Sequence, residues 1–134
     1  MKHSEIVPGL SSHLDPIVLQ AGGGTFTCGR QFRVLNDHRF LCISVSGGVS
    51  TWLPLYSRNG PGRLLLTKSG RTGDPSWTSR ILYYHPEQKW TAPIAAVIAA
   101  AQAAGEQSKP GKRSMLSAAE VARIVASLNQ PSAV

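Results

Sequence analysis

Histidine is the side chain best suited to acid–base work near neutral pH, because its charge changes close to pH 6.5. The 134-residue chain contains four histidines, and no two of them are spaced as H-x-H or H-x-x-x-H. The two cysteines form no C-x-x-C pair, and no two histidines have the spacing that protein zinc sites usually show. We therefore expect no bound metal and no other cofactor, and we interpret Cys28 and Cys42 as reduced core thiols.

Two local groups of polar residues could support catalysis. Asp37 and His38 are neighbours, but adjacent side chains in a strand or turn usually point apart, so we interpret them as turn residues. Ribonuclease chemistry needs only a base, an acid and a cation near the phosphate. Residues of these types occur close together, but no motif of a known nuclease accompanies them: Arg63, Arg71, Tyr83, His85 and Glu87. A small toxin-like ribonuclease is therefore our third hypothesis, behind two non-enzymatic ones.

A stronger pattern is the mixture of basic and aromatic residues in 58–90. The chain has 14 Lys and Arg against 7 Asp and Glu, a net charge of +7, which favours polyanionic partners. Basic groups can neutralise phosphates while aromatic rings stack on unpaired bases. We therefore predict a non-enzymatic module that binds RNA or single-stranded DNA. The predicted contact residues are Arg58, Arg63, Lys68, Arg71, Trp77, Arg80, Lys89 and Trp90.

The same span allows a second interpretation, a protein-interaction module such as an inhibitor or assembly factor that binds an acidic protein. We expect Trp52 to support the core and Trp77 and Trp90, which border loops, to be exposed. Arg63 and Lys68 have opposite parity along a regular strand, so the basic residues could form two patches instead of one.

The sequence also bears on the location and assembly of the protein. The N-terminal residues have no apolar stretch typical of a secretory signal, and no run approaches the length of a membrane span. These observations favour a cytoplasmic protein with no membrane partner. The two helices expected near the C-terminus could also form a homodimer interface.

Short runs rich in Ile, Val, Thr, Phe and Tyr, separated by Gly, Asn and Asp, occupy much of residues 16–84 and predict a small sheet. The clearest hairpin joins 39–46 to 49–57 through Gly47 and Gly48. Apolar residues alternate onto both faces of 39–46, which is typical of a central strand. Pro54 cannot donate a ladder hydrogen bond, so we expect 49–57 to be an edge strand or to contain a bulge.

The composition changes after Trp90. An alanine-rich run predicts a helix with Thr91 as N-cap that stops at Gly105. A second amphipathic helix is predicted at about 118–129, with Ser117 and Glu120 in capping-box positions.

Strands followed by helices indicate an α+β fold, either a small bent antiparallel sheet or an SH3-like β-barrel, with two C-terminal helices. We expect this organisation along the chain: a flexible N-terminal arm at 1–15, a β-rich domain with the first C-terminal helix at 16–104, a basic linker at 105–116 and the terminal amphipathic helix at 117–130.

Overall fold

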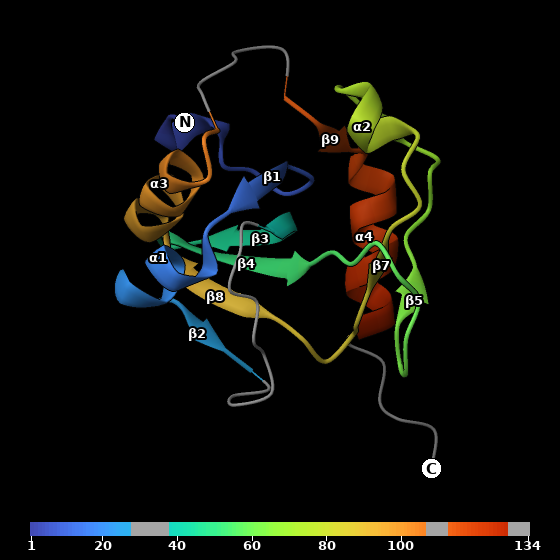
Figure 1. Cartoon of the computed structure of the whole chain (residues 1–134), viewed down its shortest axis with the longest axis horizontal. Coiled ribbons are helices and arrows are strands. Elements are labelled where there is room, and N and C mark those ends of the chain that lie inside the picture. Colours follow the sequence, from blue (N-terminus) through green and yellow to red (C-terminus); the bar gives the residue numbers. More distant parts are fainter. Residues whose placement is uncertain (28–37, 107–112, 129–134) are drawn as a thin grey trace.

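The computed structural model describes residues 1–27, 38–106 and 113–128. An antiparallel sheet of five strands occupies its centre, in the order β1-β3-β4-β8-β2 (Figure 1). The strands are β1 (Ser11–Leu14), β2 (Thr25–Phe26), β3 (His38–Ser46), β4 (Val49–Pro54) and β8 (Trp90–Pro93).

The expected hairpin forms between β3 and β4. Gly47 and Gly48 make the reversal with φ of 59° and 78°, a backbone conformation that non-glycine residues rarely adopt. A bulge lies between Cys42 and Ser44. Before the bulge, Phe40 and Cys42 pack on one face of the sheet, and after it Val45 packs with the same cluster, although simple alternation places Val45 on the opposite face.

The prediction that β4 is an edge strand is wrong. It pairs with β3 over its whole length and with β8 through Val49–Trp52. Pro54 lies beyond the last residue pair with β8, so its missing N–H interrupts no hydrogen bond of that ladder. The bulge that we considered for this hairpin lies in β3 instead.

One face of the sheet is covered by helices α1 (Pro16–Ala21) and α3 (Ile94–Ala103), as Figure 1 shows. Trp52 is fully buried in this core, as predicted. The run at 16–20, which we expected as a strand, is α1, because the Asp15 carboxylate caps its first turn by accepting hydrogen bonds from the Ile17 and Val18 amides. Thr91 belongs to β8 and does not cap α3, which begins after Pro93.

The other face carries a second core, built around Leu41, Leu53 and Trp77. Helix α4 (Ala118–Leu128) packs there through Val121 and Ile124, and the Ser117 hydroxyl accepts a hydrogen bond from the Glu120 amide, as the capping box predicts. The remaining elements on this side are α2 (Pro75–Thr78) and the short pairs β5 (Leu64–Leu65) with β7 (Tyr83–Tyr84) and β6 (Arg71–Thr72) with β9 (Met115–Leu116).

Residues of the expected arm at 1–15 and the last residues of the expected linker at 105–116 pair with other strands. Within 1–15, a 3₁₀ turn η1 (His3–Glu5) leads to the buried Leu10, and β1 then pairs with β3. At the end of the expected linker, β9 pairs with β6 and the Leu116 amide donates to the Gly9 carbonyl. Backbone hydrogen bonds and buried leucines therefore hold Leu10, β1 and β9 against the rest of the fold.

The α+β fold with an antiparallel sheet and two C-terminal helices is confirmed. The described strands form an open sheet with β1 and β2 at its edges, so the alternative of an SH3-like barrel is not confirmed. None of the helices in the described part of the chain is both long and apolar enough to span a lipid bilayer.

Cys42 is a buried free thiol, as predicted for a core residue. Burial raises its pKa to about 12, so it stays protonated and unreactive near neutral pH. Cys28 and Asp37 lie outside the described residues.

Candidate functional site

Two adjacent cavities share His13 and Arg39 in their walls. The first, of about 250 Å³, contains both acidic and basic side chains, and we call it the mixed-charge cavity. It is lined by Ser11, His13, Arg39, Asp74, Ser76, Ala104, Gly105, Glu106, Arg113 and Ser114. The second, of about 150 Å³, is the basic groove, lined by His13, His38, Arg39, Leu55, Ser57, Arg80 and Leu82.

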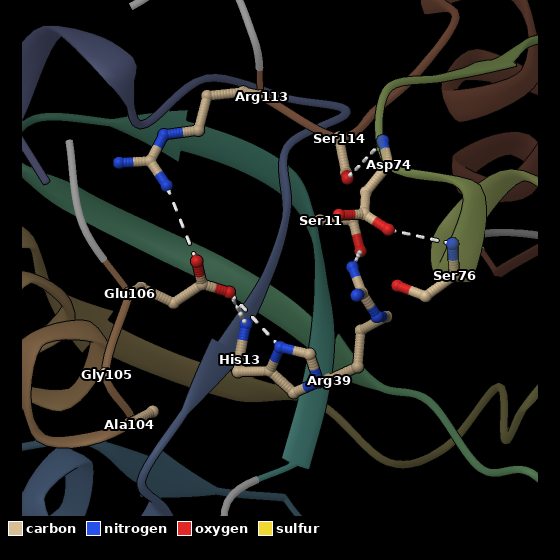
Figure 2. Close-up of a pocket in the computed structure, with 10 residues that line it drawn as sticks. All are labelled: Ser11, His13, Arg39, Asp74, Ser76, Ala104, Gly105, Glu106, Arg113 and Ser114. Carbon is tan, nitrogen blue, oxygen red and sulfur yellow. Dashed lines mark hydrogen bonds and ion pairs between the residues drawn. The ribbon is translucent and has the colours of Figure 1, made fainter. Parts of the chain in front are cut away.

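His13 forms a pair with Glu106. The residue sits in edge strand β1, and its Nδ1 lies 3.2 Å from Oε1 of Glu106, which follows α3 (Figure 2). The same oxygen accepts a hydrogen bond from the His13 backbone amide at 2.9 Å. Because a carboxylate beside Nδ1 favours the tautomer protonated there, Nε2 of the neutral ring is left as the basic nitrogen.

Glu106 is held by Arg113 as well as by His13. Nη1 of Arg113 lies 3.6 Å from its second oxygen, and Arg113 also forms an ion pair with Glu5. The hydrogen bond from the His13 ring, helped by the backbone donor and by the nearby Arg113, lowers the pKa of Glu106 to about 2. The carboxylate is therefore ionised throughout the physiological range.

The lowered pKa of Glu106 predicts that the folded state loses stability in acid. The folded-state pKa of Glu106 lies below its ordinary value of 4.5, so ionisation stabilises the fold above that pH and the contribution is lost as the pH falls toward 2. Between about pH 5 and pH 2, we expect the parent protein to lose on the order of 2 kcal/mol more stability than Glu106→Gln. Urea unfolding at several pH values measures this difference, and parallel curves for the two proteins would contradict it.

Arg39 lies in the wall between the two cavities. Its Nη1 donates to the Ser11 hydroxyl at 2.9 Å, and its guanidinium lies over the Trp77 ring at 5.5 Å. Burial lowers its pKa, while Glu106 and Asp74 oppose that shift. Since a guanidinium remains charged in proteins, Arg39 supplies a fixed and partly desolvated positive charge.

The basic groove is electrostatically different from its neighbour. Among its described lining residues none is acidic, and Arg39 and Arg80 supply two cations. Burial, with help from Arg63 and His13, lowers the pKa of His38 to about 4, so His38 is neutral near pH 7. The positive potential of the groove at neutral pH therefore comes mainly from its arginines.

Beside the groove, the Arg63 guanidinium lies over the Tyr56 ring. The guanidinium carbon is 3.7 Å from the ring centroid, and Nη1 donates to the Arg58 carbonyl at 2.9 Å. Both residues are partly exposed. A guanidinium held over an aromatic ring offers a surface on which a nucleic-acid base can stack.

The structure buries Arg71, which we predicted as a contact residue. Its side chain is only 8 % exposed, and it donates to four backbone carbonyls at 2.6 to 3.0 Å. These carbonyls belong to Leu66, Thr67, Trp77 and Arg80. Its hydrogen bonds therefore hold the connection between β5 and β7 together.

The prediction that Trp77 and Trp90 are exposed is wrong. Trp77 is fully buried, Nε1 donates to the Met115 carbonyl at 3.2 Å, and two guanidinium groups lie over its ring. Trp90 is 4 % exposed and stacks at a tilt on Phe26, with ring centroids 5.3 Å apart. Each lies next to a loop in sequence, but in space each faces a sheet core, so neither can stack on a base.

The other predicted residues are spread over the surface. Arg58 and Lys68 are exposed, Lys89 is partly exposed beside β2, and Arg80 alone of the eight lines the basic groove. The ribonuclease grouping around His85 does not assemble with Arg71, which is buried. The Nδ1 of His85 instead accepts a hydrogen bond from the Glu87 amide two residues later.

Sequence reasoning missed the site residues His13, Arg39 and Glu106. His13 and Glu106 are 93 positions apart, and no local spacing connects them. Only the pairing of β1 with β3 places His13 beside Arg39 in the sheet.

Comparison with known proteins gives no relative: no family model, no curated protein and no solved structure matches this chain. Within residues 1–27, 38–106 and 113–128, no group of three or more His, Cys, Asp or Glu side chains is placed to hold a metal ion.

Proposed function

We propose that the protein binds single-stranded nucleic acid, RNA in particular, along the basic groove. The observation that carries this proposal is the convergence of Arg39 and Arg80 in a groove whose described lining contains no carboxylate. Phosphate groups are attracted to such sites because their binding releases condensed counterions. The net charge of +7 adds a long-range attraction of the same sign.

The preference for a single strand rests on Arg63 and Tyr56. Their stacked pair lies next to the groove wall, since Tyr56 packs its ring against His38 at 5.1 Å between centroids. A base unstacked from its neighbours can lie on this pair while its phosphate reaches the groove arginines. Bases inside a duplex are stacked on each other and cannot do so.

Arg80 provides the cleanest test, because it is exposed and lines the groove. We expect Arg80→Ala to weaken binding of a fluorescent single-stranded oligonucleotide irrespective of its sequence. The slope of log K against log salt should decrease by about 0.7, the value for one lost phosphate contact on a single strand. Fluorescence anisotropy across a salt series measures both quantities.

Arg123→Ala is the matched control, since it removes the same charge from α4, where the side chain is 78 % exposed and away from the groove. We expect this variant to keep the slope of the parent protein. Equal losses in both variants would show that attraction to net charge, and not the groove, accounts for binding. Failure of the parent protein to bind at about 50 mM salt would overturn the proposed function.

A protein partner is the second candidate, favoured by three exposed apolar side chains. Leu64, Leu65 and Ile81 are 44 %, 64 % and 53 % exposed on and near the β5–β7 pair. Exposed apolar side chains mark a protein-binding surface where they form one contiguous patch. The salt series also distinguishes the two candidates, because absence of oligonucleotide binding would leave the protein partner as the better explanation of this surface.

A further inference from the structure

We infer that the protein also cleaves the RNA held in the basic groove, with His13 as the general base that activates the ribose 2′-hydroxyl. This inference rests on the proposed function and adds an activity to it. It differs from the sequence-based expectation of a non-enzymatic module and from the ribonuclease grouping around His85.

The first support is the position of His13. His13 and Arg39 line both the mixed-charge cavity and the basic groove. Of these two residues, only His13 can exchange a proton near neutral pH. Its side chain is 41 % exposed, so a substrate can reach it. Figure 2 shows Nδ1 directed at Glu106, while the opposite side of the ring is turned toward Arg39.

The second support is the anchoring of Glu106. A base is effective when its proton-accepting nitrogen is free and its ring cannot rotate away. Oε1 of Glu106 contacts both the ring and the backbone amide of His13, at 3.2 and 2.9 Å, and Arg113 holds the other oxygen. Glu106 thus acts as a positioning residue that leaves Nε2 to accept a proton.

The third support is Arg39, which is fixed next to His13. Its hydrogen bond to the Ser11 hydroxyl and its contact with the Trp77 ring hold the guanidinium in place. A preorganised cation of this kind stabilises the charge that develops on the non-bridging oxygens of a phosphate during attack. Base and cation therefore both belong to the wall that the two cavities share.

The reaction is an internal transesterification. Nε2 of His13 takes the proton of the 2′-hydroxyl, and the 2′-oxygen forms a bond to phosphorus. The bond from phosphorus to the 5′-oxygen breaks, and the leaving oxygen takes a proton from a water molecule. The hydroxide produced is neutralised by the His13 imidazolium, which restores the neutral ring. The products are a 2′,3′-cyclic phosphate and a 5′-hydroxyl.

The test uses the full-length chain and two oligonucleotides of the same sequence, in EDTA because the step uses no metal ion. The RNA reports cleavage, while the DNA version lacks the 2′-hydroxyl and reports binding alone. We expect the parent protein to convert the RNA to fragments with 2′,3′-cyclic phosphate ends. His13→Gln keeps a donor for Glu106, and we expect its cleavage rate at saturating RNA to fall roughly 10²–10⁴-fold, a loss that weaker binding, measured with the DNA, does not account for.

Two further variants locate the activity. His85→Gln is the matched control, because it removes a histidine from outside both cavities, and we expect full cleavage from it. Glu106→Gln tests the positioning role, and we expect kcat to fall with KM unchanged. Nitrogen NMR of the His13 ring should also show a changed tautomer ratio in this variant, which a purely structural role would not produce.

The possible failures are distinguishable. Binding of the DNA by the parent protein with the RNA left intact would overturn this inference and leave the proposed function standing. Absence of binding to both oligonucleotides would overturn both. Cleavage by His13→Gln at the parent rate would assign the activity to another group or to a contaminating nuclease, and would also reject the inference.

Discussion

Replacing Arg71 with alanine is expected to destabilise the protein by about 3 kcal/mol or more, a large part of the 5–15 kcal/mol available to a typical domain. The side chain donates to four carbonyls, and its bonds to the Leu66 and Trp77 carbonyls are buried. Alanine leaves these acceptors without their donor, and a buried unpaired carbonyl costs about 1–3 kcal/mol. Urea denaturation followed by circular dichroism measures the loss.

Two comparisons test the explanation. Arg71→Lys retains the charge but cannot serve four carbonyls with a planar fork, so we expect it to restore only part of the stability. Lys68→Ala removes an exposed cation from the same segment, and we expect a change within about 0.5 kcal/mol. An Arg71→Ala protein as stable as Lys68→Ala would show that the four bonds contribute little.

Trp77→Ala is the second change with a large expected effect, a loss of about 3–5 kcal/mol. The indole of this α2 residue is fully buried in the same core as Val121 and Ile124 of α4. Removing it also takes away the ring that Arg39 and Arg71 lie over, at 5.5 and 4.6 Å. Thermal and urea unfolding measure the effect.

Trp77→Phe separates volume from hydrogen bonding, because it keeps an aromatic face but removes the donor to the Met115 carbonyl. We expect the stability of Trp77→Phe to lie between those of the parent protein and the alanine variant. In a double-mutant cycle, Trp77→Ala and Arg71→Ala should be non-additive, since the two side chains touch. Strict additivity would contradict a direct contribution from the stacked pair.

These two residues also show where interpretation of the sequence failed. Arg71 and Trp77 were predicted as nucleic-acid contacts because a basic residue and an aromatic residue flanked by Gly, Pro and Ser resemble a surface loop. In the structure the two side chains contact each other. Arg71 donates hydrogen bonds to the loop carbonyls, and the Trp77 indole fills the core beneath them. Their importance is therefore for stability, and the nucleic-acid contacts that we propose lie at Arg39, Arg63 and Arg80.

Patterns that depend on near neighbours were predicted well. The β3–β4 hairpin follows from two glycines between alternating apolar runs, and α4 follows from Ser117, Glu120 and an apolar stripe. Each depends on interactions within a few residues, where the period of a strand or a helix and the chemistry of a turn decide the outcome. The expectation that Trp52 supports the core is likewise confirmed.

The sequence by itself therefore determined the α+β class, the central hairpin, the C-terminal helices and an excess of positive charge. The tertiary structure alone decided that β4 is central, that Arg71 and Trp77 are buried, and that His13 meets Glu106 and Arg39. The physical reason is sequence separation. Strand order, the burial of a loop and a contact across 93 residues depend on which distant segments pack together, and no local period records that choice.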